Sequence, residues 1–408
     1  MKILSVFGTR PEAVKMAPVV RQLAQTAGIN ARVCVTAQHR QMLDQVLDVF
    51  QIRPDYDLDL MRDDQTLAQV SAAIFTHLDP ILVDFQPDWV LAQGDTTTVA
   101  ITSLLSYYRR IRFGHVEAGL RTHDKWQPFP EEVNRRVAGV VADLHFAPTD
   151  AARQNLLSEG IDDSLIRVTG NPVIDALNIV AQQPEPLEIS ELLKQLTIPV
   201  VARSDSDEAI STSARGLLRR DTRKSIGAGE HPPRKDSREK ELILVTAHRR
   251  ENFGQPLEDV CEALRQLASR GDVEIVYPVH LNPNVQEPVQ RLLGNVPHIT
   301  LLPPLDYLPL VHLMKRARII LTDSGGIQEE APAFGVPVLV LREVTERPEG
   351  VAAGTLKLVG TDTRRIVEEA TRLLDDASAH AEMAQASNPF GDGHAAERIV
   401  ESLLQTSR

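Results

Sequence analysis

Short apolar runs rich in β-branched residues alternate along the chain with amphipathic stretches, and the alternation occurs twice. In the first half it predicts strands at Lys2–Phe7, Val33–Thr36, Trp89–Gln93, Phe113–Val116, His145–Pro148 and Arg167–Thr169, with helices such as Gln41–Phe50 and Thr66–Phe85 between them. In the second half it predicts strands at Leu242–Thr246, Glu274–Pro278, Ile299–Leu302, Ile319–Leu321, Val338–Leu341 and Leu356–Val359, and helices at Leu257–Ser269, Tyr307–Ala317, Gly326–Phe334 and Thr363–Asp375. Strands that alternate with helices form β-α-β units, so the pattern predicts an α/β protein with parallel sheets.

The length of 408 residues exceeds what one hydrophobic core usually serves, so we expect two domains, at residues 1–170 and 171–375. A net charge of −12 argues against a broad nucleic-acid-binding surface. The opening apolar run is too short for a secretion signal, and no apolar stretch approaches the roughly 18 residues of a membrane span. We therefore expect a cytoplasmic protein. Cys34 and Cys261 lack a metal-ligand spacing and are expected in the core.

Residues 203–240 differ from the rest of the chain because they are rich in Ser, Gly, Pro and charge, with few apolar positions. Such a segment buries too little apolar surface to offset the entropy of ordering it. We expect a disordered insertion here.

Basic residues follow the first predicted strand, where Phe7-Gly-Thr-Arg-Pro-Glu leads into a helical pattern. The segment matches neither G-x-G-x-x-G nor G-x-x-x-x-G-K-[ST], so it supports neither a dinucleotide site nor a Walker-type site. Arg10 and Lys15 lie at the sheet edge where open α/β folds bind ligands, and they suit a diphosphate. The alternative is a pair of ordinary solvated side chains.

Three acids lie at comparable positions in the first half. Asp95 and Glu117 each follow an apolar strand, and Glu131 opens a helix after a Pro-Phe-Pro turn. Each has a structural alternative: Asp95 suits a helix N-cap, and Glu131 suits the positive end of a helix dipole. Together they favour a proton-transfer site.

In the second half a strand leads through Ser324-Gly325-Gly326 into a helix. Glycines let the backbone approach a ligand closely, and a helix start offers unpaired N–H groups to phosphate. Glu330, further along that helix, suits a ribose diol, and Arg347 adds a cation near the same edge. His248 ends the first strand of this half, in the position that Arg10 has in the other half.

The combined segments resemble the non-hydrolysing UDP-N-acetylglucosamine 2-epimerases of bacteria. The resemblance rests on Phe7-Gly-Thr-Arg-Pro-Glu-Ala, Thr36-Ala-Gln-His-Arg, Gln93-Gly-Asp-Thr-Thr, His115-Val-Glu-Ala-Gly-Leu-Arg-Thr, Pro130-Glu-Glu-Val-Asn-Arg, Gly170-Asn-Pro-Val-Ile-Asp, Ala247-His-Arg-Arg-Glu-Asn-Phe-Gly, Asp323-Ser-Gly-Gly-Ile-Gln-Glu-Glu and Thr345-Glu-Arg-Pro-Glu. These segments span nearly the whole chain outside the insertion.

The resemblance implies a glycosyltransferase-B-like fold, with two Rossmann-like domains facing a cleft and a C-terminal helix, at 393–405, returning to the first domain. It implies reversible conversion of UDP-N-acetylglucosamine to UDP-N-acetylmannosamine through 2-acetamidoglucal, which supplies surface polysaccharide synthesis. It further implies a homodimer that needs no metal or nicotinamide cofactor. By family match the acid/base candidates are Asp95, Glu117 and Glu131, with His248 near the diphosphate or assisting proton transfer. The UDP-binding candidates are Arg10, Lys15, Ser324, Gly325, Gly326, Glu330 and Arg347.

Some bacterial members of the family bind a second substrate molecule as an activator, and Gln38, His39, Gln65 and Glu132 match that region. Asp64 stands where some relatives have Arg, so allosteric activation is a hypothesis here. Leu305 and Leu310 stand where relatives often have Gln and Phe near the uracil, which leaves the base selectivity open. The alternative functions are a hydrolysing epimerase, a retaining glycosyltransferase of the same fold and a non-catalytic nucleotide-sugar sensor.

Overall fold

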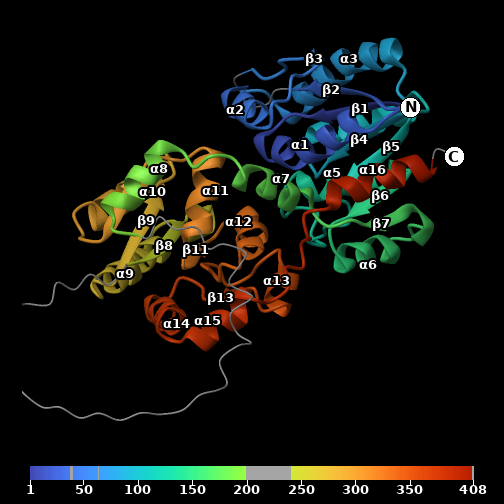
Figure 1. Ribbon diagram of the computed structural model, residues 1–408. Coiled ribbons are helices and arrows are strands. Elements are labelled where there is room, and N and C mark those ends of the chain that lie inside the picture. Colours follow the sequence, from blue (N-terminus) through green and yellow to red (C-terminus); the bar gives the residue numbers. More distant parts are fainter. Residues whose placement is uncertain (37–39, 63, 199–239, 407–408) are drawn as a thin grey trace, which may run out of the picture.

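The computed structural model describes residues 1–36, 40–62, 64–198 and 240–406, and they form two parallel sheets covered by helices (Figure 1). The segment expected to be a disordered insertion, 203–240, lies outside the described residues except for Lys240. The elements of the first half are β1 Lys2–Phe7, α1 Arg10–Gln25, β2 Asn30–Val35, α2 Arg40–Phe50, β3 Tyr56–Asp57, α3 Leu67–Phe85, β4 Trp89–Gln93, α4 Thr97–Tyr108, β5 Arg112–Val116, α5 Glu131–Val141, β6 Leu144–Ala147, α6 Asp150–Ser158, η1 Asp163–Leu165 and β7 Ile166–Val168.

Two helices follow the first sheet, and the second sheet comes after them. The remaining elements are α7 Pro172–Ala181, α8 Leu187–Gln195, β8 Glu241–Thr246, η3 Arg250–Asn252, α9 Gln255–Ala268, β9 Val273–Pro278, α10 Pro283–Leu293, β10 Ile299–Leu302, α11 Tyr307–Arg316, β11 Ile319–Thr322, α12 Gly325–Glu330, η4 Ala331–Phe334, β12 Val338–Val340, α13 Pro348–Ala352, β13 Leu356–Leu358, α14 Thr363–Asp375, α15 Ala377–Ala384 and α16 Ala395–Thr406. Among the described helices, none is long and apolar enough to cross a membrane.

The strands confirm the predicted α/β fold with two parallel sheets. The first sheet has the order β3-β2-β1-β4-β5-β6-β7 and the second β10-β9-β8-β11-β12-β13. Every predicted strand is present, but β3 was not predicted, because two residues at a sheet edge leave no alternation to detect. The predicted helix 326–334 is divided into α12 and the 3₁₀ turn η4, because Pro332 has no N–H to continue the α-helical hydrogen bonds.

This strand order gives each sheet one topological switch point, where the connections after two neighbouring strands run towards opposite edges of the sheet. It lies between β1 and β4 in the first sheet and between β8 and β11 in the second. Ligands of open α/β sheets bind outside the carboxyl ends of the strands at such a point. The residues that follow these four strands include Arg10, Asp95, His248 and Ser324, so the topology puts four predicted site residues at the two switch points.

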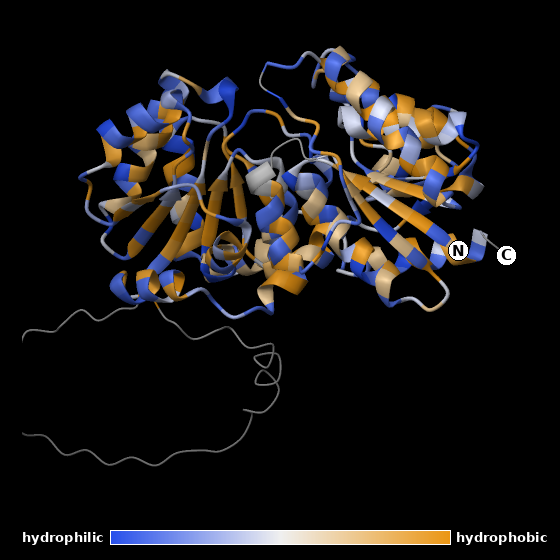
Figure 2. Ribbon diagram, turned by 90° about the horizontal axis from the view of Figure 1, so that it is seen from above, coloured by the Kyte–Doolittle hydropathy of each residue, from blue (hydrophilic) through white to orange (hydrophobic). Residues whose placement is uncertain are grey.

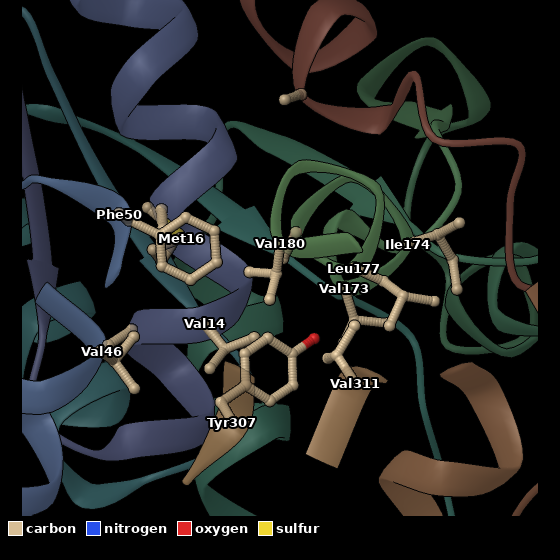
Figure 3. Packing of buried hydrophobic residues seen from close by; sticks show 14 of the residues in the cluster. Val14, Met16, Val46, Phe50, Val173, Ile174, Leu177, Val180, Tyr307 and Val311 are labelled. Atoms are coloured by element: carbon tan, nitrogen blue, oxygen red, sulfur yellow. The ribbon is translucent and has the colours of Figure 1, made fainter. Parts of the chain in front are cut away.

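A shared apolar core connects the two halves through α7. Figure 2 shows that the strands of both sheets are mainly hydrophobic, whereas polar residues gather on the outward faces of the helices. One buried cluster includes Met16 of α1, Leu177 and Val180 of α7, and Val311 of α11 (Figure 3). Because α7 packs against both α1 and α11, it fixes the first half against the second on one side of the molecule.

The chain crosses between the halves at two closely packed points. The backbone N–H of Asn171 donates to the carbonyl of Phe390 over 2.7 Å. Gly170 has φ +85°, and a Cβ atom there would lie 3.2 Å from the Cα of Gly391, so both the backbone conformation and the close approach require glycine. Beyond the second crossing, α16 packs against α1 and α7.

Candidate active site

The loop after β1 is held in place by Glu12. Thr9 caps α1, and the Glu12 carboxylate accepts from the backbone N–H groups of Gly8, at 2.9 Å, and Thr9, at 2.6 Å. Its other oxygen accepts from the Thr96 hydroxyl at 2.6 Å. Glu12 therefore joins the loop that carries Arg10 to the loop that carries Asp95.

Hydrogen bonds from three side chains hold the carboxylate of Glu117. It follows β5 with φ +62° and is 7% exposed. Lys15 of α1 donates to its Oε1 over 2.5 Å, the Gln93 amide donates to its Oε2, and Asn171 donates to Oε1 over 2.8 Å. Three elements far apart in sequence thus orient this carboxylate.

Lys15 and Glu117 are held as an ion pair. Burial disfavours the charged form of each, but their mutual attraction outweighs it. The pKa of Glu117 is therefore lowered and that of Lys15 raised. Arg347 of the second half also favours the ionised Glu117. Glu117 is therefore a carboxylate at neutral pH.

Residues from the second half reach the same cluster. The Asn171 amide donates to Glu329 Oε2 over 2.8 Å, and the Nε of Arg347 donates to Glu329 Oε1. Burial opposes the charge of Arg347, but Glu329 and Glu117 outweigh it and raise the pKa of the guanidinium. The predicted residues Lys15, Glu117 and Arg347 therefore belong to one network, at the facing edges of the two sheets.

Asp95, after β4, is held by residues of α5, the helix that Glu131 opens. The Asp95 carboxylate is paired with the Arg135 guanidinium, and its carbonyl accepts from Asn134 over 2.9 Å. Glu131 is the first residue of α5. Arg135 interacts electrostatically with both Asp95 and Glu117, which brings two of the three predicted acids within the influence of one cation.

His248 belongs to a loop built around a buried carboxylate. The Oδ2 of Asp323 accepts from the backbone N–H groups of His248 and Arg249, both at 2.8 Å, and from the Asn252 amide at 3.1 Å. The His248 ring stacks on His280, with centroids 5.2 Å apart. Burial lowers the pKa of His248, and the charge of Arg10 acts in the same direction, which shows that Arg10 faces the second half.

The Ser324-Gly325-Gly326 turn opens α12, with Ser324 as its N-cap. A Cβ atom on Gly325 would lie 3.6 Å from Nη2 of Arg347 and 3.8 Å from Nη2 of Arg249. Two guanidinium groups therefore flank the start of α12, which is an arrangement suited to an anion.

Glu330 is the last residue of α12, and it is buried. A Cβ atom on Gly326 would lie 3.5 Å from its Oε1. Burial, together with the neighbouring Glu329, raises the pKa of Glu330 to about 8, whereas Arg10 and Lys15 act to lower it. The carboxyl group is thus close to cations from the first half and mainly protonated at neutral pH in the free protein.

The four residues matched to an activator site have different surroundings. Gln38 and His39 lie outside the described residues. The Gln65 amide accepts from the N–H of Arg62 over 2.8 Å and donates to the carbonyl of Leu60 over 3.1 Å, which closes its own loop. Glu132 is fully buried and accepts from Arg135, Arg136 and the backbone N–H of Thr122.

Several residues of the site belong to the matched sequence motifs, but no role was predicted for them. They are Glu12, Gln93, Asn171, Arg249, Asp323 and Glu329. Their spacing offered one usable signal, a capping box from Thr9 to Glu12. Across the described ranges, no group of three or more His, Cys, Asp or Glu side chains is arranged to hold a metal ion.

Two facing Rossmann-like halves, with a glycine turn flanked by guanidinium groups on one and buried acids on the other, are typical of α/β enzymes that act on phosphorylated ligands. Comparison with known proteins gives the family. A family model described as UDP-N-acetylglucosamine 2-epimerase matches residues 21–203 and 212–404. The chain belongs to this family of isomerases.

Individual relatives match over nearly the full length. The UDP-N-acetylglucosamine 2-epimerases of Escherichia coli O157:H7 and Escherichia coli strain K12 are each 52% identical over 407 residues, which is 99% of this chain and 98% of theirs. The crystal structure of the Neisseria meningitidis UDP-GlcNAc 2-epimerase bound to UDP-GlcNAc is 45% identical, with a TM-score of 0.80 over 99% of this chain and 100% of that one. The Methanocaldococcus jannaschii enzyme in complex with UDP-GlcNAc and UDP is 28% identical, with a TM-score of 0.73 and the same coverage.

Proposed function

We propose that the chain interconverts UDP-N-acetylglucosamine and UDP-N-acetylmannosamine without hydrolysis. The family supports the substrate, since the Neisseria meningitidis relative has UDP-GlcNAc bound. The observation that carries the mechanism is the single network in which Glu117, an acid/base candidate, meets Glu329 and Arg347, which flank the anion-binding turn. Proton transfer and leaving-group departure are thereby brought to one place.

The diphosphate is the leaving group in this proposal. Gly325 and Gly326 offer backbone N–H groups to it, Ser324 offers its hydroxyl, and Arg10, Lys15 and Arg347 offer positive charge. Donors aimed at the developing negative charge stabilise the transition state of C1–O bond cleavage. Glu330 accepts from the ribose diol in its ionised form. These contacts hold UDP between the two steps of the reaction.

The sugar reacts by elimination and re-addition. A carboxylate takes the C2 proton, the C2–H electron pair forms the C1=C2 double bond, and the C1–O pair leaves with UDP. UDP then adds back to 2-acetamidoglucal while an acid delivers a proton to the opposite face of C2. Removal of a proton from one face of C2 and delivery to the other require at least two acid/base groups. The candidates are Asp95, Glu117 and Glu131, with His248 near the diphosphate.

The oligomeric state, the cellular location and the pathway of the protein are part of the same proposal. We infer a cytoplasmic homodimer that uses no metal or nicotinamide and supplies a precursor of surface polysaccharides. The adjacent helices α3, α4 and α5 carry exposed apolar side chains, namely Val83, Tyr107, Tyr108 and Val140, and exposed apolar surface suits a self-complementary contact. Light scattering of the purified chain tests the dimer. Activation by a second substrate molecule stays a hypothesis, tested by whether added UDP-N-acetylglucosamine makes the reverse reaction start without a lag.

Chromatography of the reaction products separates this function from its alternatives. Incubation with UDP-N-acetylglucosamine alone should give an equilibrium mixture of the two nucleotide sugars without accumulation of free UDP. Stoichiometric UDP and free N-acetylmannosamine would instead indicate a hydrolysing epimerase. Turnover only when an acceptor is added would indicate a glycosyltransferase, and tight binding without turnover would indicate a sensor.

A further inference from the structure

Asn171 lies where the chain first crosses between the halves, and its side-chain nitrogen contacts a carboxylate from each. The Nδ2 atom donates to Glu117 Oε1 and to Glu329 Oε2, both over 2.8 Å. All three side chains are buried, and Asn171 is 1% exposed. One amide group therefore joins an acid of the first half to the carboxylate that orients Arg347 in the second.

The remaining polar atoms of Asn171 are also in use. Its Oδ1 accepts from the backbone N–H of Val173 over 3.1 Å and caps α7, and its backbone N–H donates to Phe390. The capping and crossing roles need only one side-chain acceptor and the backbone, which Asp or Ser would also supply. The two donated hydrogen bonds need an NH₂ group, because Asp has no donor when ionised and Ser has one.

We propose that Asn171 is a positioning residue of the reaction, which aligns Glu117 with the Glu329–Arg347 pair and so couples diphosphate binding to proton transfer. The inference rests on the proposed function. Glu117 has two further donors, Lys15 and Gln93, but both belong to the first half. Among the hydrogen-bond partners of Glu117 in the described residues, Asn171 alone also donates to Glu329, so it links the reacting groups of the two halves directly.

Two substitutions separate positioning from helix capping. Asn171→Ser keeps a capping oxygen and removes the bridge without adding charge. Asn171→Asp keeps the capping oxygen, but it replaces the donor NH₂ group with a second carboxylate oxygen next to Glu117 and Glu329. Asn178→Asp, on an exposed position of the same helix α7, is the matched control. Each variant is compared with the wild type in kcat, in KM, in UDP dissociation constant by calorimetry and in thermal midpoint.

We expect kcat to fall about 10- to 100-fold in Asn171→Ser and further in Asn171→Asp, because buried hydrogen bonds to a charged group are lost. The UDP dissociation constant should stay within about threefold, because Arg347 keeps its pairing with Glu329. Asn178→Asp should match the wild type. A large fall in kcat with nearly unchanged UDP affinity is not expected if Asn171 only caps α7 or only packs in the core.

The inference is overturned if a folded Asn171→Ser or Asn171→Asp protein keeps kcat within about twofold of the wild type. Equal losses in kcat and UDP affinity would also overturn it, because they would indicate a general disturbance of the site. A wild-type protein that does not epimerise would refute the proposed function and this inference with it. An active wild type beside unaffected variants refutes the inference alone.

Discussion

Lys15 and Glu117 form a buried ion pair, with 2.5 Å between Nζ and Oε1, although 102 residues separate them in the chain. The pair joins α1 to the end of β5 and keeps Glu117 ionised in spite of its burial. Because the charge of Lys15 stabilises the carboxylate, the lysine has two effects in this account. It binds the diphosphate, and it sets the protonation of an acid/base candidate.

Lys15→Met should therefore impair chemistry as well as binding. The pKa of Glu117 should rise once its main counter-charge is removed, so the acid side of the kcat profile should move to higher pH. Removing one partner of a buried pair costs about 3–5 kcal/mol, and we expect kcat/KM to fall by at least about 100-fold. A pH–rate profile compares Lys15→Met with Lys15→Arg, which keeps the charge. An unchanged acid limb in the Met variant would show that Lys15 does not control Glu117.

Gly325→Ala should weaken UDP binding with little effect on folding. The added methyl group would lie 3.6 Å from the Arg347 guanidinium, in the space where we place the diphosphate. We expect at least about tenfold weaker binding, or about 1.4 kcal/mol, by calorimetry. Gly139→Ala, inside α5, is the control and should leave UDP affinity unchanged. Wild-type affinity in Gly325→Ala would move the diphosphate away from this turn.

UDP affinity should depend on pH through Glu330. Its pKa is about 8 in the free protein, whereas the proposed contact with the ribose diol uses the ionised carboxylate. Binding at pH 7 then releases a proton, and the affinity should rise about tenfold between pH 7 and pH 9. Calorimetry in buffers of different ionisation enthalpy measures the released proton. Glu330→Gln should bind more weakly and release none; the same proton release from this variant would point to another group.

The stability of the first half should fall in mild acid because of two buried histidines. Burial lowers the pKa of His115 to about 4 and that of His145 to about 3, against 6.5 for an exposed histidine. The unfolded chain therefore binds more protons below pH 6.5, and the free energy of unfolding falls with falling pH. Between pH 6.5 and pH 5 we expect each histidine to lower the free energy of unfolding by about 2 kcal/mol. Denaturant titrations of the wild type and His145→Gln measure this slope, which should be less steep in the variant by the share of one histidine; equal slopes would contradict the assignment.

Local sequence predicts those parts of the site that depend on one strand and the helix after it. The Ser324-Gly325-Gly326 turn could be predicted because glycines between a strand and a helix have few other uses. The parallel strands place Arg10, Asp95 and His248 at the sheet edges by topology alone.

Contacts between distant segments could not be predicted in this way. In sequence Asn171 is only a helix cap, and its bridge to Glu117 and Glu329 depends on where the chain crosses between the halves. Asp323 precedes the Ser324-Gly325-Gly326 turn, but its part in holding the His248 loop depends on the pairing of β8 with β11. The resemblance assigns Glu132 to an activator site. Only the structure shows that its carboxylate accepts hydrogen bonds from Arg135 and Arg136.

Incubation with UDP-N-acetylglucosamine in deuterated water tests the central claim most directly. If the acids at the sheet edges remove and return the C2 proton, deuterium will appear at C2 of the recovered nucleotide sugars, and no free sugar will form. Asp95→Asn and Glu117→Gln should abolish this exchange while UDP binding survives. Epimerised product that keeps protium at C2, or release of free N-acetylmannosamine, would contradict the account.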